Sequence, residues 1–331
     1  MEHDGRGAGT MKRHNFLAGD WVLVRSREEI LSTLDADGTL DGLPFMPEML
    51  DWCGKHFRVE RRAEKTCVDV DPPGQGIRRF AADDVVFLDG PRCDGSGHDG
   101  CKRGCKVFWK EAWLRPINSM ETPTGTSGIA LDQLPSRLKT KSDETHYFCQ
   151  STQLSKATEA FPKSIRGLWR LRIFTREIRN GDRSLPEILK LLVLWLWQRL
   201  LRKVHGDQWL RGPHKRTPVV SLDLKPGEPV RTKSRAEVVA TLDVNRSNRG
   251  LKICYEATRC CGAHAEVRDR VDRLINERTG EMREVRNTVT IQNVRGKMTT
   301  RDSECVCFDE PGDCPRGELM YWREIWLERA K

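Results

Sequence analysis

The sequence predicts an α+β protein in which two tandem, small β-barrel-like repeats, SH3-like in character, are joined by a linker and a helical hairpin. The first observation is an internal repeat. Residues 19–35 recur as residues 227–243, and the match continues without a gap to Cys53 and Cys261. The second is a series of short β-branched and aromatic runs between Gly-rich turns. The third is a segment between the copies with apolar residues at helical spacing. A generic α+β domain is the alternative fold for each copy.

The repeat returns near the end of each copy, after a few extra residues in the second. The matched pairs there are Cys101 and Cys314, Arg103 and Arg316, Gly104 and Gly317, Trp109 and Trp322, Glu111 and Glu324, and Trp113 and Trp326. A unit of roughly a hundred residues is the size of one small domain. We therefore expect residues 16–115 and 222–331 to share one fold.

The composition fits a globular protein of about two domains. Lys and Arg number 57 and Asp and Glu 48, so the net charge is +9, which allows phosphate-bearing or anionic-membrane partners. The first residues are polar and lack the apolar run of a signal peptide, so we expect a cytoplasmic location, peripheral to a membrane at most. Disulfides are rare in that compartment. The twelve cysteines therefore favour metal ligands or redox groups.

The first copy is preceded by a predicted disordered leader, residues 1–15. Strands are predicted where β-branched and aromatic residues cluster, at 21–24, 57–61, 85–88 and 108–114. A loop rich in Cys, Gly and His separates the last two, at 92–105.

Helix starts are marked by capping residues. Ser26 and Glu29 form a capping box that predicts a short helix over 28–34, and Ser234 and Glu237 repeat it in the second copy. Pro47 suits the first turn of another short helix.

Residues 116–163 are polar and rich in Pro, Thr, Ser and Lys, which predicts a linker. Two helices should follow over 164–180 and 184–204, joined by a short turn into an antiparallel hairpin within the segment 164–205. The apolar run of the second helix, Leu191 to Trp197, is far shorter than the roughly twenty residues of a membrane-spanning helix.

The hairpin has two interpretations. It either packs between the repeats as shared core, or presents Trp169, Trp195 and Trp197 to a partner or an anionic membrane surface. We expect Trp195 or Trp197 to be partly exposed, because a helix that is apolar nearly all round cannot bury every side chain against one face. The expected partners are a pathway protein, a second copy of the chain, or the membrane surface.

The cysteines of the first copy suggest a metal site. Cys93, Cys101 and Cys105 lie in one loop with interleaved glycines, which let the backbone bend around an ion. Cys67 would supply a fourth thiolate, and His98 or Cys53 could replace one ligand. Four soft ligands select Zn²⁺ or an iron–sulfur cluster, with zinc favoured. Buried or merely reactive thiols are the alternative.

The second copy has a weaker candidate group. Cys261 and Cys314 match cysteines of the first copy, and Cys305 and Cys307 could complete a set of four. The counterparts of Cys67 and Cys105 are Ile275 and Glu318. Three further cysteines are interpreted as small buried hydrophobic residues: Cys149, Cys254 and Cys260.

Other chemistry-bearing residues have structural interpretations. His56 and His264 lie at matched positions where a strand begins. The paired tryptophans of each copy, four residues apart, should anchor the cores from one face of a strand. A basic strip beside the metal loop is interpreted as a solvated face: Arg58, Arg61, Arg62, Lys65, Arg78 and Arg79. The sequence contains no Gly-rich phosphate loop, nucleophile elbow or HExxH motif.

One set of segments carries a family resemblance: 40–49, 53–59, 65–67, 92–95, 98–105, 108–114 and 321–327. These segments resemble a bacterial family of uncharacterised, duplicated Cys-rich proteins. Members of that family are often encoded near polyketide, nonribosomal-peptide or polysaccharide biosynthesis genes. The resemblance therefore implies a biosynthetic pathway setting and no particular reaction. The chain departs from the family pattern at 253–260.

Together these patterns favour a Cys-ligated metal-binding accessory or scaffold protein of a bacterial biosynthetic pathway. The main alternative is a zinc or iron–sulfur metalloenzyme of that pathway. It would need an unpaired carboxylate or His over the metal, and Asp94, His98 and Asp99 are the nearby candidates. A nucleic-acid-binding module is the third alternative.

Overall fold

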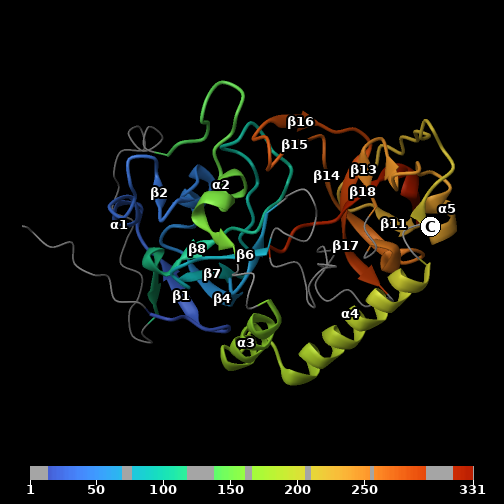
Figure 1. Cartoon of the computed structure of the whole chain (residues 1–331). Helices are drawn as coiled ribbons and strands as arrows, with labels where there is room; N and C mark the ends of the chain where they lie inside the picture. Colours follow the sequence, from blue (N-terminus) through green and yellow to red (C-terminus); the bar gives the residue numbers. More distant parts are fainter. Residues whose placement is uncertain are drawn as a thin grey trace, which may run out of the picture.

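The computed structural model is a mixed helix-and-sheet protein in which strands predominate (Figure 1). It describes residues 14–68, 77–117, 138–160, 166–205, 210–253, 257–295 and 316–330. Most of the predicted leader, and Cys254, Cys305, Cys307 and Cys314, lie outside these ranges.

Each copy contains a five-stranded sheet. The first comprises β1 (Trp21–Val24), β4 (His56–Arg62), β7 (Val85–Leu88), β8 (Trp109–Lys110) and β9 (Leu114–Pro116), in the order β8-β7-β4-β1-β9. The second comprises β11 (Pro229–Thr232), β14 (His264–Arg270), β17 (Thr288–Arg295), β18 (Tyr321–Arg323) and β19 (Leu327–Arg329), in the order β18-β17-β14-β11-β19. The two orders correspond strand for strand, and the neighbouring strands are antiparallel throughout.

Smaller sheets extend the two units. They are the pairs β2 (Thr39–Leu40) with β3 (Leu43–Pro44), β12 (Ser247–Asn248) with β13 (Leu251–Lys252), and β15 (Arg273–Ile275) with β16 (Met282–Glu284), and the set β5 (Thr66–Cys67), β6 (Ile77–Arg79) and β10 (Glu159–Ala160). The β15–β16 pair reaches from the second unit back towards the first, where it contacts the Cys-rich loop (Figure 1).

Short helices occupy matched positions. The α-helices α1 (Arg27–Leu31) and α5 (Arg235–Val239) both begin with the predicted capping box. Short 3₁₀ helices follow at η1 (Pro47–Trp52) and η7 (Ala257–Cys260), and again at η2 (Glu111–Trp113) and η8 (Glu324–Trp326). Each capping box satisfies two backbone N–H groups that a helix start would otherwise leave without an acceptor.

The two cores are built around the same polar and aromatic contacts. Trp109 and Trp113 are fully buried in the first core, and Trp322 and Trp326 in the second. The indole of Trp113 donates to Thr33 Oγ1 at 3.2 Å, and that of Trp326 to Thr241 Oγ1 at 2.9 Å.

An Arg–Glu pair with a buried glutamate is also repeated. Arg62 donates to Glu111 at 2.6 Å in the first unit, and Arg270 to Glu324 at 2.9 Å in the second. Because these partners come from equivalent strands and turns, the match in sequence extends to specific contacts.

Three expectations need correction. The segment 108–114 is not one strand, because η2 interrupts it and turns Glu111 inward to Arg62. The predicted linker contains α2 (Gln150–Ala157), which buries Leu154 completely against the first core. The basic strip is a solvated face only in part, because Arg61, Arg62 and Lys65 are buried, while Arg58 is exposed and Arg78 and Arg79 are half-buried.

The helical segment also differs from expectation. The helices α3 (Arg166–Arg179) and α4 (Leu185–His205) form as predicted, but they diverge after their turn and do not pack as an antiparallel hairpin (Figure 1). Ion pairs from Arg176 to Glu64 and Asp83 hold α3 against the first unit. Helix α4 runs from there towards the second unit. Within the described chain, no helix combines the length and apolar character needed to cross a bilayer.

Candidate functional site

The loop between β7 and β8 is folded tightly around Gly95. This glycine has φ +76°, and an added Cβ would lie 2.1 Å from the carbonyl oxygen of Cys101. Its own carbonyl accepts hydrogen bonds from the N–H groups of His98 and Gly100 at 2.9 and 3.0 Å. Only glycine fits here, as the sequence pattern of the loop suggested.

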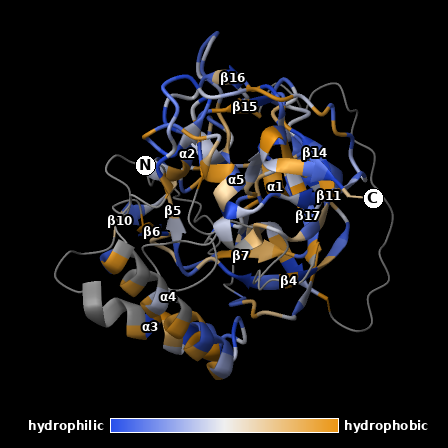
Figure 2. Ribbon diagram, turned by 90° about the vertical axis from the view of Figure 1, so that its right-hand side faces the viewer, coloured by the Kyte–Doolittle hydropathy of each residue, from blue (hydrophilic) through white to orange (hydrophobic). Residues whose placement is uncertain are grey.

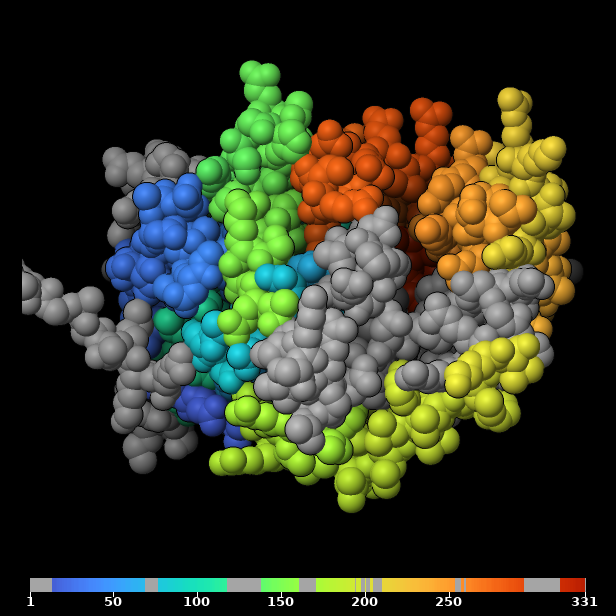
Figure 3. Space-filling view, in the orientation of Figure 1, coloured from blue at the N-terminus to red at the C-terminus, as the bar shows by residue number. Residues whose placement is uncertain are grey.

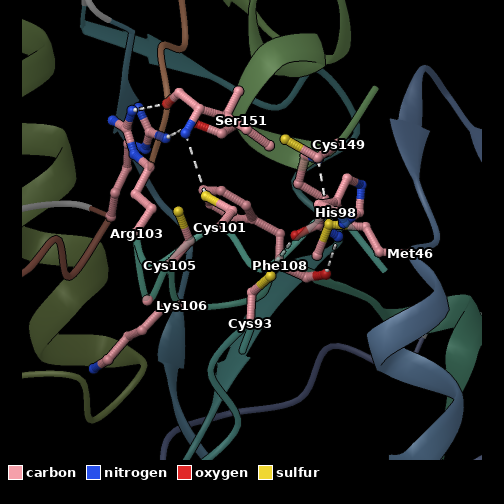
Figure 4. Close-up of a pocket in the computed structure, with 14 residues that line it drawn as sticks. Met46, Cys93, His98, Cys101, Arg103, Cys105, Lys106, Phe108, Cys149 and Ser151 are labelled. Carbon is pink, nitrogen blue, oxygen red and sulfur yellow. Dashed lines mark hydrogen bonds between the residues drawn. The ribbon is translucent and has the colours of Figure 1, made fainter. Parts of the chain in front are cut away.

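The loop encloses a cavity where the two units meet. The cavity has a volume of about 30 Å³, room for about two water-sized groups. Four thiols line it, from Cys93, Cys101, Cys105 and Cys149 (Figure 4). The second unit contributes Ile275, whose N–H donates to Cys101 Sγ at 3.3 Å, and Arg316.

Main-chain pairing brings two of these cysteines opposite one another. Arg92 and Lys106 form an antiparallel bridge, and the N–H of Cys93 donates to the carbonyl of Cys105 at 2.9 Å. Cys149 comes from a different segment, at the start of α2. The thiols therefore converge on the cavity from separate parts of the chain.

Cys93, Cys105 and Cys149 are held in their neutral form. Burial raises the pKa of Cys93 far above its ordinary value, and the nearby Glu48 carboxylate raises it further. Burial also raises the pKa of Cys149, and raises that of Cys105 to about 12 despite the neighbouring Arg103. Thiols in this state are weak nucleophiles, so a ligand that takes thiolates must displace their protons.

His98 and Glu48 form a buried ion pair beside the cavity. His98 Nδ1 lies 2.6 Å from Glu48 Oε1, and Nε2 lies 3.0 Å from the carbonyl oxygen of Phe148. Both ring nitrogens face acceptors, so both must donate, and the imidazole is protonated. Burial opposes this charge, but the Glu48 carboxylate raises the pKa of His98 above its usual value. Burial would raise the pKa of Glu48, yet His98 holds it below its usual value.

A second charged cluster closes the other side of the cavity. Arg103 of the first unit donates to Glu277 at 3.0 Å and to Glu318 at 2.5 Å. Its sequence counterpart Arg316 also donates to Glu277, and donates to Ser151 Oγ at 2.8 Å. Burial opposes the ionisation of Glu318, but the two guanidinium groups lower its pKa to about 2.

The expected ligand set is only partly assembled. Cys93, Cys101, Cys105 and His98 line the cavity, whereas Cys67 and Cys53 do not. Cys67 reaches the cluster through its carbonyl oxygen, which accepts from Arg316 at 3.2 Å. Cys149 is buried in the first core, as expected, and it also lines the cavity. No spacing signal could have shown this, because Cys149 belongs to a segment predicted to be a linker.

No metal-binding geometry is formed by the side chains that the structure describes. Among them, no three His, Cys, Asp or Glu residues are placed to hold one ion. In the second unit, Cys261 is buried and donates to the carbonyl of Ala257 at 3.9 Å, while the other three candidates fall outside the described ranges. His56 and His264 each begin a strand and are exposed, as expected.

The three residues considered for catalysis all have partners. His98 is bound as described above. Asp94 accepts from the N–H and hydroxyl of Ser96 at 2.9 and 2.8 Å. Asp99 accepts from Tyr147 at 2.5 Å and pairs with Lys141 at 2.9 Å.

Comparison with known proteins does not assign the site. No protein-family model, curated protein or solved structure matches this chain.

Proposed function

We propose that the protein binds a soft metal ion, Zn²⁺ above all, through the thiols of Cys93, Cys101, Cys105 and Cys149. The single observation that supports this is the convergence of four thiols on one cavity at the junction of the two units. Thiolate sulfur prefers zinc among the common divalent ions of cells. Cys149 replaces Cys67 in the ligand set expected from the sequence.

Metal binding in this proposal requires the four sulfur atoms to move closer together. Cys93 would give up the proton that it donates to Glu48 at 3.6 Å, whereas Cys101 as a thiolate could still accept from the N–H of Ile275. Zn–S bonds of about 2.3 Å would offset the loss at Cys93. His98 is not a ligand here, because both of its nitrogens are occupied.

The role that fits this site is that of an accessory or scaffold protein. An ion at the junction would fix the two units, taken as copies of one small SH3-like barrel, relative to one another. A metalloenzyme is less well supported, because Asp94, His98 and Asp99 are all engaged. A nucleic-acid module is less well supported, because Arg61, Arg62 and Lys65 are buried. The bacterial biosynthetic setting and the cytoplasmic location rest on the sequence alone.

Cobalt substitution tests the proposal. Stoichiometric Co²⁺ should give thiolate-to-metal charge-transfer absorption, and Zn²⁺ should displace it. Cys105→Ser and Cys149→Ser should each lose the band, while Cys53→Ser should retain it, because Cys53 does not line the cavity. A band that survives in both cavity variants, or no binding by the reduced protein, would disprove the proposal.

The main-chain pairing of Cys93 with Cys105 favours a second candidate function, a reversible disulfide. Opposite residues of an antiparallel pair have Cα atoms about 4.5–5.5 Å apart, within the span of a disulfide. Glutathione disulfide would accept two electrons and two protons from the two thiols, forming the S–S bond and two molecules of glutathione. Thiol counting by mass after alkylation should then show two fewer reactive cysteines in wild type, and no change in Cys105→Ser.

A further inference from the structure

Helix α4 carries an exposed apolar face along its whole length. Seven apolar side chains on it are more than half exposed: Leu185, Leu189, Val193, Leu196, Trp197, Leu200 and Val204. At 100° per residue they fall within an arc of about 120°. The opposite side of the helix holds the buried side chains of Ile188 and Leu191. One side of α4 therefore packs on the protein and another faces outward.

Basic residues border this face and dominate the whole α3–α4 segment. Lys190 and Lys203 are exposed and fall at the two edges of the apolar arc. Residues 166–205 contain ten Lys and Arg but three Asp and Glu, so they hold seven of the nine net positive charges of the chain. The rest of the sequence is close to neutral.

We propose that this face of α4 is a docking surface for an anionic lipid bilayer, on which the helix lies flat. Helix α4 runs along the lower edge of the molecule, at its surface (Figures 1 and 3), and apolar residues colour much of it (Figure 2). Its 21 residues correspond to about 30 Å of helix, and exposed apolar side chains occur from Leu185 to Val204 along that length. An amphipathic helix with Trp on the apolar side and Lys at the edges has the features of interfacial binding.

The positive charge of the α3–α4 segment favours an anionic bilayer over a second copy of the chain as the binding partner. A second copy of the chain would bring two strongly basic segments together, and the repulsion would oppose self-association. An anionic headgroup layer attracts the same charges, with each lysine near the surface strengthening binding about fivefold. Trp197 is 58% exposed, whereas the four matched tryptophans of the two cores are fully buried. An indole in this position inserts readily at the headgroup level.

Vesicle co-sedimentation of the full chain tests the inference. The protein should bind vesicles that contain phosphatidylglycerol and should not bind pure phosphatidylcholine at ordinary salt. Val193→Asp and Trp197→Glu should abolish binding, and Lys190→Gln and Lys203→Gln should each weaken it about fivefold. Val244→Asp is the matched control, because Val244 is 62% exposed but lies outside α4. It should bind like wild type.

Circular dichroism and light scattering separate lipid binding from misfolding and from self-association. All five variants change exposed positions, so their spectra should match that of wild type. Three results would overturn the inference: equal binding to both vesicle types, binding unchanged by Val193→Asp, or a wild-type dimer that Val193→Asp converts to a monomer. The last would assign the face to a second copy.

Discussion

Single residues decide whether the Cys-rich loop can form at all. Gly95 combines a left-handed backbone with an approach that no side chain could share. Gly54 has nearly the same φ, +74°, but nothing within 4 Å of the position where a Cβ would be. Comparing substitutions at Gly95 and Gly54 therefore separates the cost of a left-handed backbone from the cost of a steric clash.

Gly95→Ala should destabilise the protein far more than Gly54→Ala. We expect about 1–2 kcal/mol for the left-handed backbone alone at Gly54, and more than about 3 kcal/mol at Gly95, where the loop must also move. Urea denaturation of both variants measures the difference. Equal losses would show that the loop opens freely.

Asp182 makes stability depend on pH. Burial raises its pKa from 3.8 to about 7, helped by the Glu64 and Glu177 carboxylates and opposed by the N–H of Arg62. The folded protein thus binds a proton that the unfolded chain releases between these values. Stability from this group is complete below pH 3.8 and is lost as the pH rises through about 7.

Asp182→Asn should remove that dependence. At pH 8 the variant should be more stable than wild type, on the order of 1 kcal/mol, and the advantage should vanish towards pH 4. Thermal melts across this range provide the measurement. Asp223→Asn serves as the control, because Asp223 is 69% exposed and pairs with Lys225. It should show no such trend between pH 5 and 8.

At the scale of elements, the two capping boxes allow a direct comparison between the units. Ser26 Oγ accepts from Glu29 N at 3.3 Å, and Ser234 Oγ from Glu237 N at 3.4 Å. The carboxylate of each Glu accepts the N–H of its serine in return, at 3.1 and 2.9 Å.

Ser26→Ala and Ser234→Ala should therefore have equal costs, about 1 kcal/mol each. Chemical denaturation of the two variants measures this. Ser221→Ala, at an exposed position, should change stability by less than about 0.5 kcal/mol. Costs that differ more than twofold would contradict the equivalence of the two helix starts.

Local signals predicted some elements well and could not predict others. The strands at Trp21–Val24 and Val85–Leu88 have the expected bounds, because their apolar runs are short and end at turns. The η2 turn was missed, since it depends on Glu111 meeting Arg62 from another strand. Helix α2 was missed because polar residues fill it, and Leu154 is its only fully buried apolar side chain.

The candidate site was predictable only in part, because some of its residues come from segments distant in the sequence. Spacing within one loop identified Cys93, Cys101 and Cys105, which lie at the cavity. Cys149 and Glu48 reach the same region from other segments, and nothing in a single sequence reports such long-range proximity. The partial exposure of Trp197 was confirmed, because it follows from the apolar content of one helix.

At the scale of the whole molecule, the charged cluster holds the two units together. Glu277 is almost completely buried and accepts from Arg103, Arg316 and Ser151. Arg103 and Ser151 belong to the first half of the chain and Arg316 to the second. Loss of this carboxylate would leave the buried guanidinium group of Arg316 and the partly buried one of Arg103 short of an acceptor.

Glu277→Gln should lower the stability of the protein by about 3 kcal/mol, as expected when one partner of a buried ion pair is removed. Calorimetry should also show a broader or split transition, because the two units would unfold less cooperatively. Glu328→Gln is the control. Its pair with Arg231 is exposed, and its loss should cost less than about 1 kcal/mol.

Arg103 and Arg316 occupy equivalent positions of the two copies, as do Cys105 and Glu318, two residues further along each copy. Each arginine lies near the Cys or Glu of the other copy. Arg103 pairs with Glu318, and Arg316 opposes the effect of burial, which raises the pKa of Cys105. Arg92 donates to the carbonyls of the matched residues Gly104 and Gly317, one from each copy. Reciprocal contacts of this kind define the isologous interface of a twofold homodimer. In a homodimer both subunits must carry the same residue at each position. A single chain has no such restriction, so one half can hold a thiol, Cys105, where the other holds a carboxylate, Glu318.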